Sequence, residues 1–338
     1  MKRVGAGGQE GTRAAILTGI LPFCLAALLQ CAAAGAQAGE RYAVIVTGAS
    51  GGEVYAKKYD IWRQAMVDTL RDTFGYAQDH VIVLAETERD GIIKATRANV
   101  QRVLTDLRRR VGRDDQLLVL LIGHGTSMDG EDAKFNLVGP DLSAAEWAEL
   151  LRPIQGRLVF VNTSSASFPF LRRISGRGRV VLTATDSAAQ QFETVFPEFF
   201  IKALTDSEAD LDKNGRVSIW EAFSYASAAV QRTFQEKGQL PTERPLLDDT
   251  GVGVGREAQT PGADGAIAKI TYLQPDAPVA LPSNAALAEL VKRRAELEAQ
   301  IEALKARKDT MPADQYDSEL ERLLVEMARV SAQIRTKS

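Results

Sequence analysis

Residues Gln116-Leu-Leu-Val-Leu-Leu-Ile-Gly-His-Gly-Thr126 join the most apolar run of the sequence to a histidine between two glycines. Seven uncharged residues that end at a glycine predict a strand covered on both faces, as is usual in a parallel sheet. Chemistry in open parallel sheets gathers at the carboxyl ends of the strands. The segment therefore predicts a buried strand over 116–122 and a candidate acid–base group, His124, at its end.

Shorter apolar runs flank this strand on both sides, and helical spacing of apolar residues fills the intervals between them. Ser143 and Glu146 form a capping box before one of these helices. Strand and helix alternate from residue 41 to about 205, which predicts an α/β fold with a mostly parallel sheet in three layers. The further predicted strands are 41–48, 81–84, 158–161 and 180–182.

The composition narrows the class of function. With 41 Lys and Arg against 44 Asp and Glu, the formal net charge of the 338 residues is −3, which gives no support for a nucleic-acid partner. Apolar content of 45% and charged content of 25% are typical of a globular protein. The only cysteines are Cys24 and Cys31, and the only histidines are His80 and His124. A metal site built from several Cys or His ligands is nearly excluded.

The N-terminus is typical of an export signal. Basic residues come first, an apolar run over 14–29 follows, and small residues end in Ala36-Gln-Ala38. This pattern predicts a signal peptide over 1–38 with cleavage after Ala38, and a periplasmic or secreted protein. The alternatives are an uncleaved anchor or lipidation at Cys31, and only these would attach the chain to a membrane.

Cleavage after Ala38 would remove both cysteines. The mature chain would then contain no disulfide, no thiolate metal site and no cysteine nucleophile. This absence shapes every functional hypothesis below.

The strongest local motif is Asp210-Leu-Asp-Lys-Asn-Gly-Arg-Val-Ser-Ile-Trp-Glu221, which matches a twelve-residue EF-hand-type calcium loop. Calcium needs several oxygen ligands on a sharply curved loop, and Gly215 permits the turn. The expected ligands are Asp210, Asp212, Asn214, the carbonyl of Arg216, Ser218 and Glu221. The alternative is a polar turn followed by a helix capping box from Ser218 to Glu221. No second complete loop is present to pair with this one.

The last part of the chain changes character. Residues 252–283 are rich in Gly, Pro and Ala and predict a linker, with one short strand over 268–273. Residues 284–338 carry apolar residues at 3,4 spacing, interrupted at 311–314, and predict a helical hairpin or coiled coil. Three arrangements stay open: the helices pack on each other, on a second copy of the chain, or remain a solvated pair.

Two further polar segments follow predicted strands. Residues 162–167 read Asn-Thr-Ser-Ser-Ala-Ser after the strand at 158–161, so a serine nucleophile could face His124 across adjacent strand ends. Spacing alone does not select the serine. Residues 47–52 resemble the start of a dinucleotide-binding loop, but the next glycine of that pattern falls on Val54.

Taken together, these motifs resemble the caspase-fold (caspase/hemoglobinase) peptidases, in particular the legumain-like branch of asparaginyl endopeptidases and transamidases. The resemblance covers roughly residues 41–250 and predicts a three-layer caspase-like domain over 39–251. It rests on Tyr42-Ala-Val-Ile-Val46, Leu120-Leu-Ile-Gly-His-Gly-Thr126, Val159-Phe-Val-Asn-Thr-Ser-Ser-Ala-Ser167, Val180-Val-Leu-Thr-Ala-Thr-Asp186 and residues 196–200.

The resemblance implies roles for individual residues. In that fold a histidine ends the third strand and a cysteine the fourth, so His124 takes the catalytic position and Ser164 the nucleophile position. Gly125 falls where the family has its oxyanion-hole amide, and Asp186 is a candidate for a substrate pocket. The thiol of the family is replaced here by the hydroxyl of Ser164. A hydroxyl is far less acidic than a thiol and needs a well-oriented base, so we expect peptidase chemistry of the family type to be lost.

Three hypotheses follow for the function. The favoured one is an exported, calcium-binding pseudo-peptidase that binds peptides or partner proteins in its cleft. The second is an active serine-dependent endopeptidase, transamidase or esterase that uses Ser164 and His124. The third is a structural module of the cell envelope that associates with itself through residues 284–338.

Overall fold

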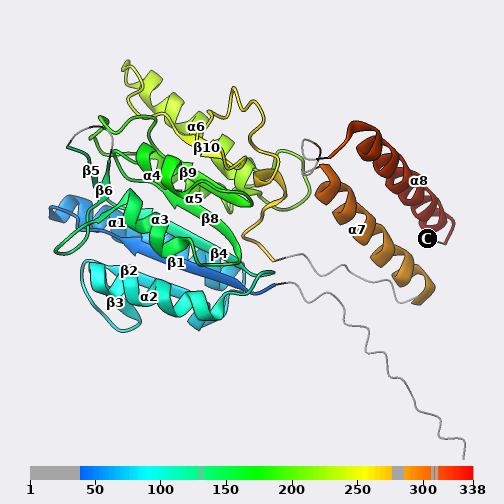
Figure 1. The fold of residues 1–338 in the computed structure, drawn as a ribbon, viewed down its shortest axis with the longest axis horizontal. Coiled ribbons are helices and arrows are strands. Elements are labelled where there is room, and N and C mark those ends of the chain that lie inside the picture. Colours follow the sequence, from blue (N-terminus) through cyan, green and yellow to red (C-terminus); the bar gives the residue numbers. More distant parts are fainter. Residues whose placement is uncertain are drawn as a thin grey trace, which may run out of the picture. The chain divides into compact units, whose positions relative to one another are not determined.

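The computed structural model describes residues 39–128, 130, 132–275, 285–305, 308 and 311–337 of the chain. Within them, a seven-stranded sheet has the order β10-β9-β8-β4-β1-β2-β3 (Figure 1). Neighbouring strands are parallel except β10, which runs antiparallel to β9. The strands are β1 (Arg41–Thr47), β2 (Val81–Ala85), β3 (Ile92–Lys94), β4 (Gln116–Ile122), β8 (Arg157–Asn162), β9 (Arg179–Thr183) and β10 (Leu246–Asp248).

The apolar run at 116–122 forms the middle strand of this sheet. All seven residues of β4 are buried, and the strand lies between β1 and β8. The mixed α/β fold with a mostly parallel sheet is therefore as the sequence predicts. The short strands predicted at 41–48, 81–84, 158–161 and 180–182 are also present, as β1, β2, β8 and β9.

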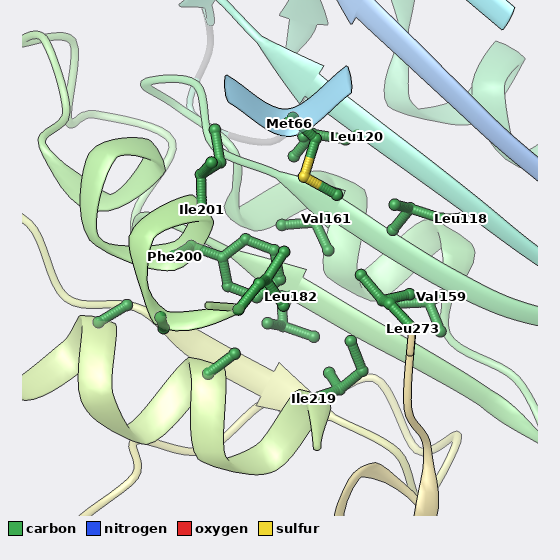
Figure 2. Packing of buried hydrophobic residues seen from close by; sticks show 14 of the residues in the cluster. Met66, Leu118, Leu120, Val159, Val161, Leu182, Phe200, Ile201, Ile219 and Leu273 are labelled. Carbon is green, nitrogen blue, oxygen red and sulfur yellow. The ribbon is translucent and has the colours of Figure 1, made fainter. Parts of the chain in front are cut away.

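Helices cover both faces of the sheet, because alternate residues of each strand point to opposite sides. Leu118, Leu120 and Ile122 pack in the cluster formed with α1 (Glu53–Asp68), α5 (Phe196–Ala203) and α6 (Ile219–Glu236). The intervening residues pack in a second cluster with α2 (Arg97–Arg110), α3 (Ala144–Leu151) and α4 (Phe168–Ile174). In Figure 2, Met66 of α1 and Phe200 of α5 approach the strand residues Leu120 and Leu182 from one side.

Short elements complete this part of the chain. The capping box from Ser143 to Glu146 begins α3, as predicted. A small antiparallel sheet follows His124 and has the order β5-β6-β7. The remaining elements are β5 (Gly125–Thr126), β6 (Lys134–Phe135), β7 (Leu142–Ser143), a π-helical turn Thr69–Thr73 and 3-10 turns Gln78–His80 and Ala268–Ile270.

The prediction of a linker over 252–283 is wrong for its first part. Ala268 and Leu273 are fully buried and belong to the core beside α6. Arg256 exchanges two backbone hydrogen bonds with Leu247 and so covers the outer edge of β10. Local composition, rich in Gly and Pro, excludes long helices but does not exclude packing against a core formed elsewhere. The predicted strand at 268–273 is a 3-10 turn followed by a single bridge at Tyr272. Residues 276–283 lie outside the described residues.

The C-terminal helices α7 (Ala285–Lys305) and α8 (Ala313–Lys337) pack on each other. Leu297, Leu304, Tyr316 and Leu323 are among the six residues that form their common core. Arg293 of α7 donates to Glu326 of α8 over 3.1 Å, so the two helices run antiparallel. The two helices thus pack on each other within one chain, and association with a second copy stays a prediction.

The predicted signal peptide and both cysteines lie outside the described residues, and the cleavage site stays a prediction. Among the helices that the structure describes, none combines the length and the apolar character needed to cross a membrane.

Candidate functional site

The fold brings the candidate groups to one edge of the sheet. Strands β1 and β4 are neighbours, but α1 follows β1 on one face while α3 follows β4 on the other. Ligands of open α/β sheets bind outside the carboxyl ends of the strands at such a switch point. His124 follows β4 there, and Ser164 follows the adjacent strand β8.

The imidazole of His124 is held by neighbours from α1 and from the loop between β1 and α1. Its Nε2 lies 3.1 Å from the hydroxyl of Tyr59 and 3.2 Å from the carbonyl oxygen of Ser50. A carbonyl can only accept, so Nε2 carries a proton when it bonds to Ser50. The ring of Tyr55 also meets the imidazole edge to face at 4.7 Å. The two groups that bond to Nε2 of His124 are thus a tyrosine hydroxyl and a backbone carbonyl, and neither is a serine hydroxyl.

Tyr59 takes part in this arrangement as a neutral phenol. Its side chain is buried, and burial raises the pKa of Tyr59 well above its ordinary value. Tyr55 and Tyr59 lie four residues apart, on the same side of α1, and both reach His124. The sequence analysis missed both tyrosines; their i, i+4 spacing just after β1 was the available signal.

Ser164 is fully buried at the end of β8. Its hydroxyl lies 2.7 Å from Oδ1 of Asn162 and donates to it, and its backbone N–H donates to the same oxygen over 3.0 Å. The hydroxyl is therefore turned into its own loop. Among the described residues, the hydrogen bonds of Ser164 do not include His124, so the two predicted partners share an edge of the sheet without forming a dyad.

The amide predicted for the oxyanion hole is also occupied. The N–H of Gly125 donates to the hydroxyl of Ser165 over 3.1 Å, and that hydroxyl donates back to the Gly125 carbonyl over 3.0 Å. The two segments are in close contact, because a Cβ placed on Gly125 would lie 2.1 Å from the carbonyl oxygen of Ser165. An oxyanion hole works through donors that point at the space where charge develops. Here that donor is paired inside the protein.

The turn after Ser164 is strained. Ala166 has φ +50°, a left-handed conformation that costs an L-residue about 1 kcal/mol or more. It is held there by a hydrogen bond of 2.7 Å from its N–H to the carbonyl of Gln190, in the loop after β9. Backbone strain of this kind is often found at binding and catalytic sites.

Asp186, the predicted pocket residue, lies at the end of β9 in an ion-pair group. Its carboxylate accepts from Arg244 over 3.0 Å, and Arg244 also pairs with Glu257. All three side chains are partly exposed, so the network places charge at the surface and adds little stability.

The predicted calcium loop brings its acidic side chains together. Asp210, Asp212 and Glu221 each offer an oxygen, and these oxygens lie within 4.8 Å of one another. Gly215 has φ +84°, the left-handed turn that the motif requires. Three carboxylates at this separation repel one another unless a cation lies between them. The donor set is all oxygen and fits a hard cation, although it does not identify which one.

Glu221 also caps helix α6. Its Oε2 accepts from the backbone and hydroxyl of Ser218, and its Oε1 accepts from the N–H of Leu211 over 2.8 Å. The capping box that the sequence offered as the alternative is therefore present. The carboxylate is buried within the loop, where those donors stabilise its negative charge.

No protein-family model matches the sequence, and no curated protein matches it. Among solved structures, protein GSU0716 of Geobacter sulfurreducens is 15% identical with a TM-score of 0.41, covering 64% of this chain and 97% of its own. The Drosophila initiator caspase Dronc is 10% identical with a TM-score of 0.43, covering 64% and 82%. Raptor of Chaetomium thermophilum is 11% identical with a TM-score of 0.36, covering 85% and 34%. These likenesses are remote, so the proposals below rest on the geometry of the two sites.

Proposed function

We propose that the chain is an exported, calcium-binding pseudo-peptidase of the caspase-like, legumain-like type, which binds peptide segments at the carboxyl ends of its strands without cleaving them. The proposed family places a histidine and a nucleophile after two adjacent strands. His124 after β4 and Ser164 after β8 stand in those positions, which supports the assignment.

The observation that carries the loss of catalysis is the closed contact between Gly125 and Ser165. It occupies the amide that would stabilise an oxyanion, and the two segments are so close that a Cβ on Gly125 would lie 2.1 Å from the carbonyl oxygen of Ser165. The nucleophile position is buried, and Nε2 of His124 is bound to other groups. The hydroxyl of Ser164, the imidazole of His124 and the amide of Gly125 stand where a serine hydrolase has its nucleophile, base and oxyanion donor. Each of these groups is already hydrogen-bonded to another group of the protein.

Peptide binding is supported by the rim of this edge. Val54, Met128 and Phe192 are exposed by 76%, 101% and 71%; the first lies in the first turn of α1, and the other two lie in separate loops. Each adjoins a residue that contacts the site or a neighbouring loop: Tyr55 meets His124, and Gln191 donates to the carbonyl of Ser127 over 3.2 Å. Exposed apolar side chains are typical of surfaces that bind protein segments. The partner we propose is therefore an extended peptide with apolar side chains.

The test uses the full chain with calcium and a library of fluorescent peptides that vary in apolar residues. We expect binding without turnover, and affinity that falls in Phe192→Ser and Met128→Ser. Val325→Ser, which removes an exposed apolar residue of α8, is the matched control and should bind as the wild type does. Steady cleavage of a peptide that is lost in both Ser164→Ala and His124→Ala would establish the serine-hydrolase alternative instead.

We further propose that the ion held by residues 210–221 is calcium, in its EF-hand-type loop. An isolated loop of this kind suits the weaker affinities of extracellular calcium modules, with dissociation constants of about 10⁻⁴ to 10⁻³ M. Such a site would be filled outside the cytoplasm, which agrees with the predicted export signal. Isothermal titration with Ca²⁺ and Mg²⁺ tests the identity of the ion, and a preference for Mg²⁺ would overturn this part of the proposal.

A further inference from the structure

The sequence contains no second calcium loop to pair with residues 210–221, yet the loop is not left alone. Residues 271–274, called here the clasp segment, lie against residues 214–219. We propose that the clasp segment takes the place of a partner loop: it sets the calcium affinity of residues 210–221 by holding three of the ligand residues, and bound calcium in turn holds the clasp segment. This inference rests on the calcium binding proposed above.

The backbone of the clasp segment pairs with the loop as a strand would. Tyr272 forms an antiparallel bridge with Ser218, and the N–H of Ile219 donates to the carbonyl of Thr271 over 2.8 Å. Ser218 is one of the expected ligands and also the N-cap of α6. The bridge therefore fixes the end of the loop at Ser218, which is both an expected ligand and the residue that caps the start of α6.

Side chains of the clasp segment hold the residue whose carbonyl is an expected ligand. The guanidinium of Arg216 lies 3.9 Å from the ring centre of Tyr272, and its Nη2 donates to the carbonyl of Gln274 over 3.0 Å. The N–H of the next residue, Val217, donates to Oε1 of Gln274 over 2.9 Å. Contacts on both sides of the Arg216 carbonyl limit the directions in which it can point.

A third contact sets the orientation of the Asn214 amide. Its Nδ2 donates to the hydroxyl of Tyr272 over 3.2 Å and to Asp212 over 2.9 Å. With both N–H groups used on one side, the oxygen of the amide is directed to the other. Partners that orient metal ligands in this way typically raise metal affinity by about 10- to 100-fold.

The clasp segment is itself anchored to the body of the fold. Leu273 is fully buried, and its carbonyl accepts from the hydroxyl of Tyr76 over 3.2 Å. Gln116 at the start of β4 donates to the carbonyl of Tyr272 over 3.1 Å. These contacts fix the platform against which the loop packs, and a fixed platform lowers the entropy cost of binding.

The coupling must act in both directions. If docking of the clasp segment raises calcium affinity, bound calcium raises the stability of docking by the same factor. Along the chain, α7 begins eleven residues after Gln274. Calcium would thus stabilise the point from which the chain continues to the C-terminal helices.

The experiment measures calcium affinity of the full chain by isothermal titration. Tyr272→Ala removes the ring and the hydroxyl and should weaken binding by about tenfold or more. Tyr272→Phe keeps the ring and the backbone bridge and should weaken it by only about threefold. Tyr225→Phe is the matched control, because this tyrosine of α6 bonds to Asp206 outside the loop. Hydrogen exchange of the wild type is the second readout, and the amides of residues 271–274 should exchange more slowly with calcium than with chelator.

The outcomes separate the two proposals. A wild-type chain that binds no calcium removes both. Calcium binding that is unchanged in Tyr272→Ala removes the clasp inference and leaves the loop as an independent site. If Tyr272→Ala does not fold, the hydrogen exchange of the wild type decides: equal exchange of residues 271–274 with and without calcium overturns the coupling.

Discussion

The edge of the sheet around His124 and the loop at residues 210–221 both carry polar groups, but they satisfy them differently. At the sheet edge, each group has a partner of the opposite kind: Ser164 donates to Asn162, and Gly125 exchanges two hydrogen bonds with Ser165. In the loop, carboxylates of the same charge meet, with oxygens within 4.8 Å of one another. The hydrogen-bonding groups of the sheet edge are paired, whereas the carboxylates of the loop would be stabilised by a cation between them.

This difference separates an edge whose catalytic-type groups are already paired from a loop whose carboxylates could hold a cation. Groups that are poised for catalysis leave a donor or a nucleophile free in the space where substrate reacts. At the sheet edge those groups are paired with one another, whereas the loop gathers carboxylates of like charge whose oxygens accept hydrogen bonds within the loop and still attract a cation. Activity thus depends on what each polar group already binds, and not only on which residue type stands at a catalytic position.

The largest effect is expected from Gly125→Ala. The added methyl group would lie 2.1 Å from the carbonyl of Ser165, so one of the two segments must move. We expect the free energy of unfolding, measured with urea, to fall by about 3 kcal/mol. Gly52→Ala is the control, because a Cβ there meets no atom within 4 Å. Equal stability of the two variants would show that the sheet edge is open in solution.

Removal of calcium comes next. Calcium at one hundred times its dissociation constant should stabilise the fold by about 2.7 kcal/mol, which chelator would remove and which appears as a fall in melting temperature. Glu221→Gln should abolish this response. Glutamine can still complete the capping box but lacks the second carboxylate oxygen. Glu208→Gln, an exposed neighbour, should keep the response. A response that survives in Glu221→Gln would place the ion elsewhere.

Glu243 is a buried carboxyl that lies outside both regions. Its oxygens accept from the N–H groups of Val195 and Phe196, each over 2.8 Å, and burial raises its pKa to about 7. Between these two pKa values, the folded state therefore keeps a proton on Glu243 that the unfolded state, with a pKa near 4.5, has lost. The stability that the protonated carboxyl of Glu243 contributes is fully present below the unfolded pKa, and it is lost as the pH rises through the folded pKa.

From pH 5 to pH 7, this term should lower the free energy of unfolding by about 2 kcal/mol. Glu243→Gln has no such proton and should show a flatter profile over the same range. Glu236→Gln, at the exposed end of α6, is the control and should follow the wild type. Parallel profiles for wild type and Glu243→Gln would mean that the carboxyl stays charged in the folded protein.

The smallest effect is expected from Ser164→Ala. It removes the hydroxyl that donates to Asn162 and should cost about 1 kcal/mol in urea unfolding. Peptide affinity should not change, because the hydroxyl is buried and turned away from the surface. Ser224→Ala on α6 controls for the loss of a serine hydroxyl. A loss of peptide affinity in Ser164→Ala alone would show that the serine reaches the ligand.

The parts of the fold that follow from short-range pattern could be predicted. The uninterrupted apolar run at 116–122 requires cover on both faces, and β4 lies in the middle of the sheet. The spacing of Ser143 and Glu146 predicts the start of α3. The acidic loop is also a local motif, because its predicted ligands lie within twelve residues and one turn geometry brings the carboxylates together.

The contacts that decide activity join residues far apart in the chain. Ser165 meets Gly125 across 40 positions, and Tyr59 meets His124 across 65. The same holds for the packing of Leu273, which made the predicted linker part of the core. No periodicity carries this information, since each contact depends on how strands and helices are placed relative to one another.

Spacing and residue chemistry alone predict an alternating α/β chain, the acidic loop at 210–221, a histidine after the most apolar predicted strand and the absence of cysteine beyond residue 31. These features need no distant partner. The pairing of Ser165 with the amide of Gly125, and the contact of residues 271–274 with the loop, follow from the packed fold and from nothing shorter in range. A hydrogen bond is chosen by proximity and direction, and both exist only after the core has packed.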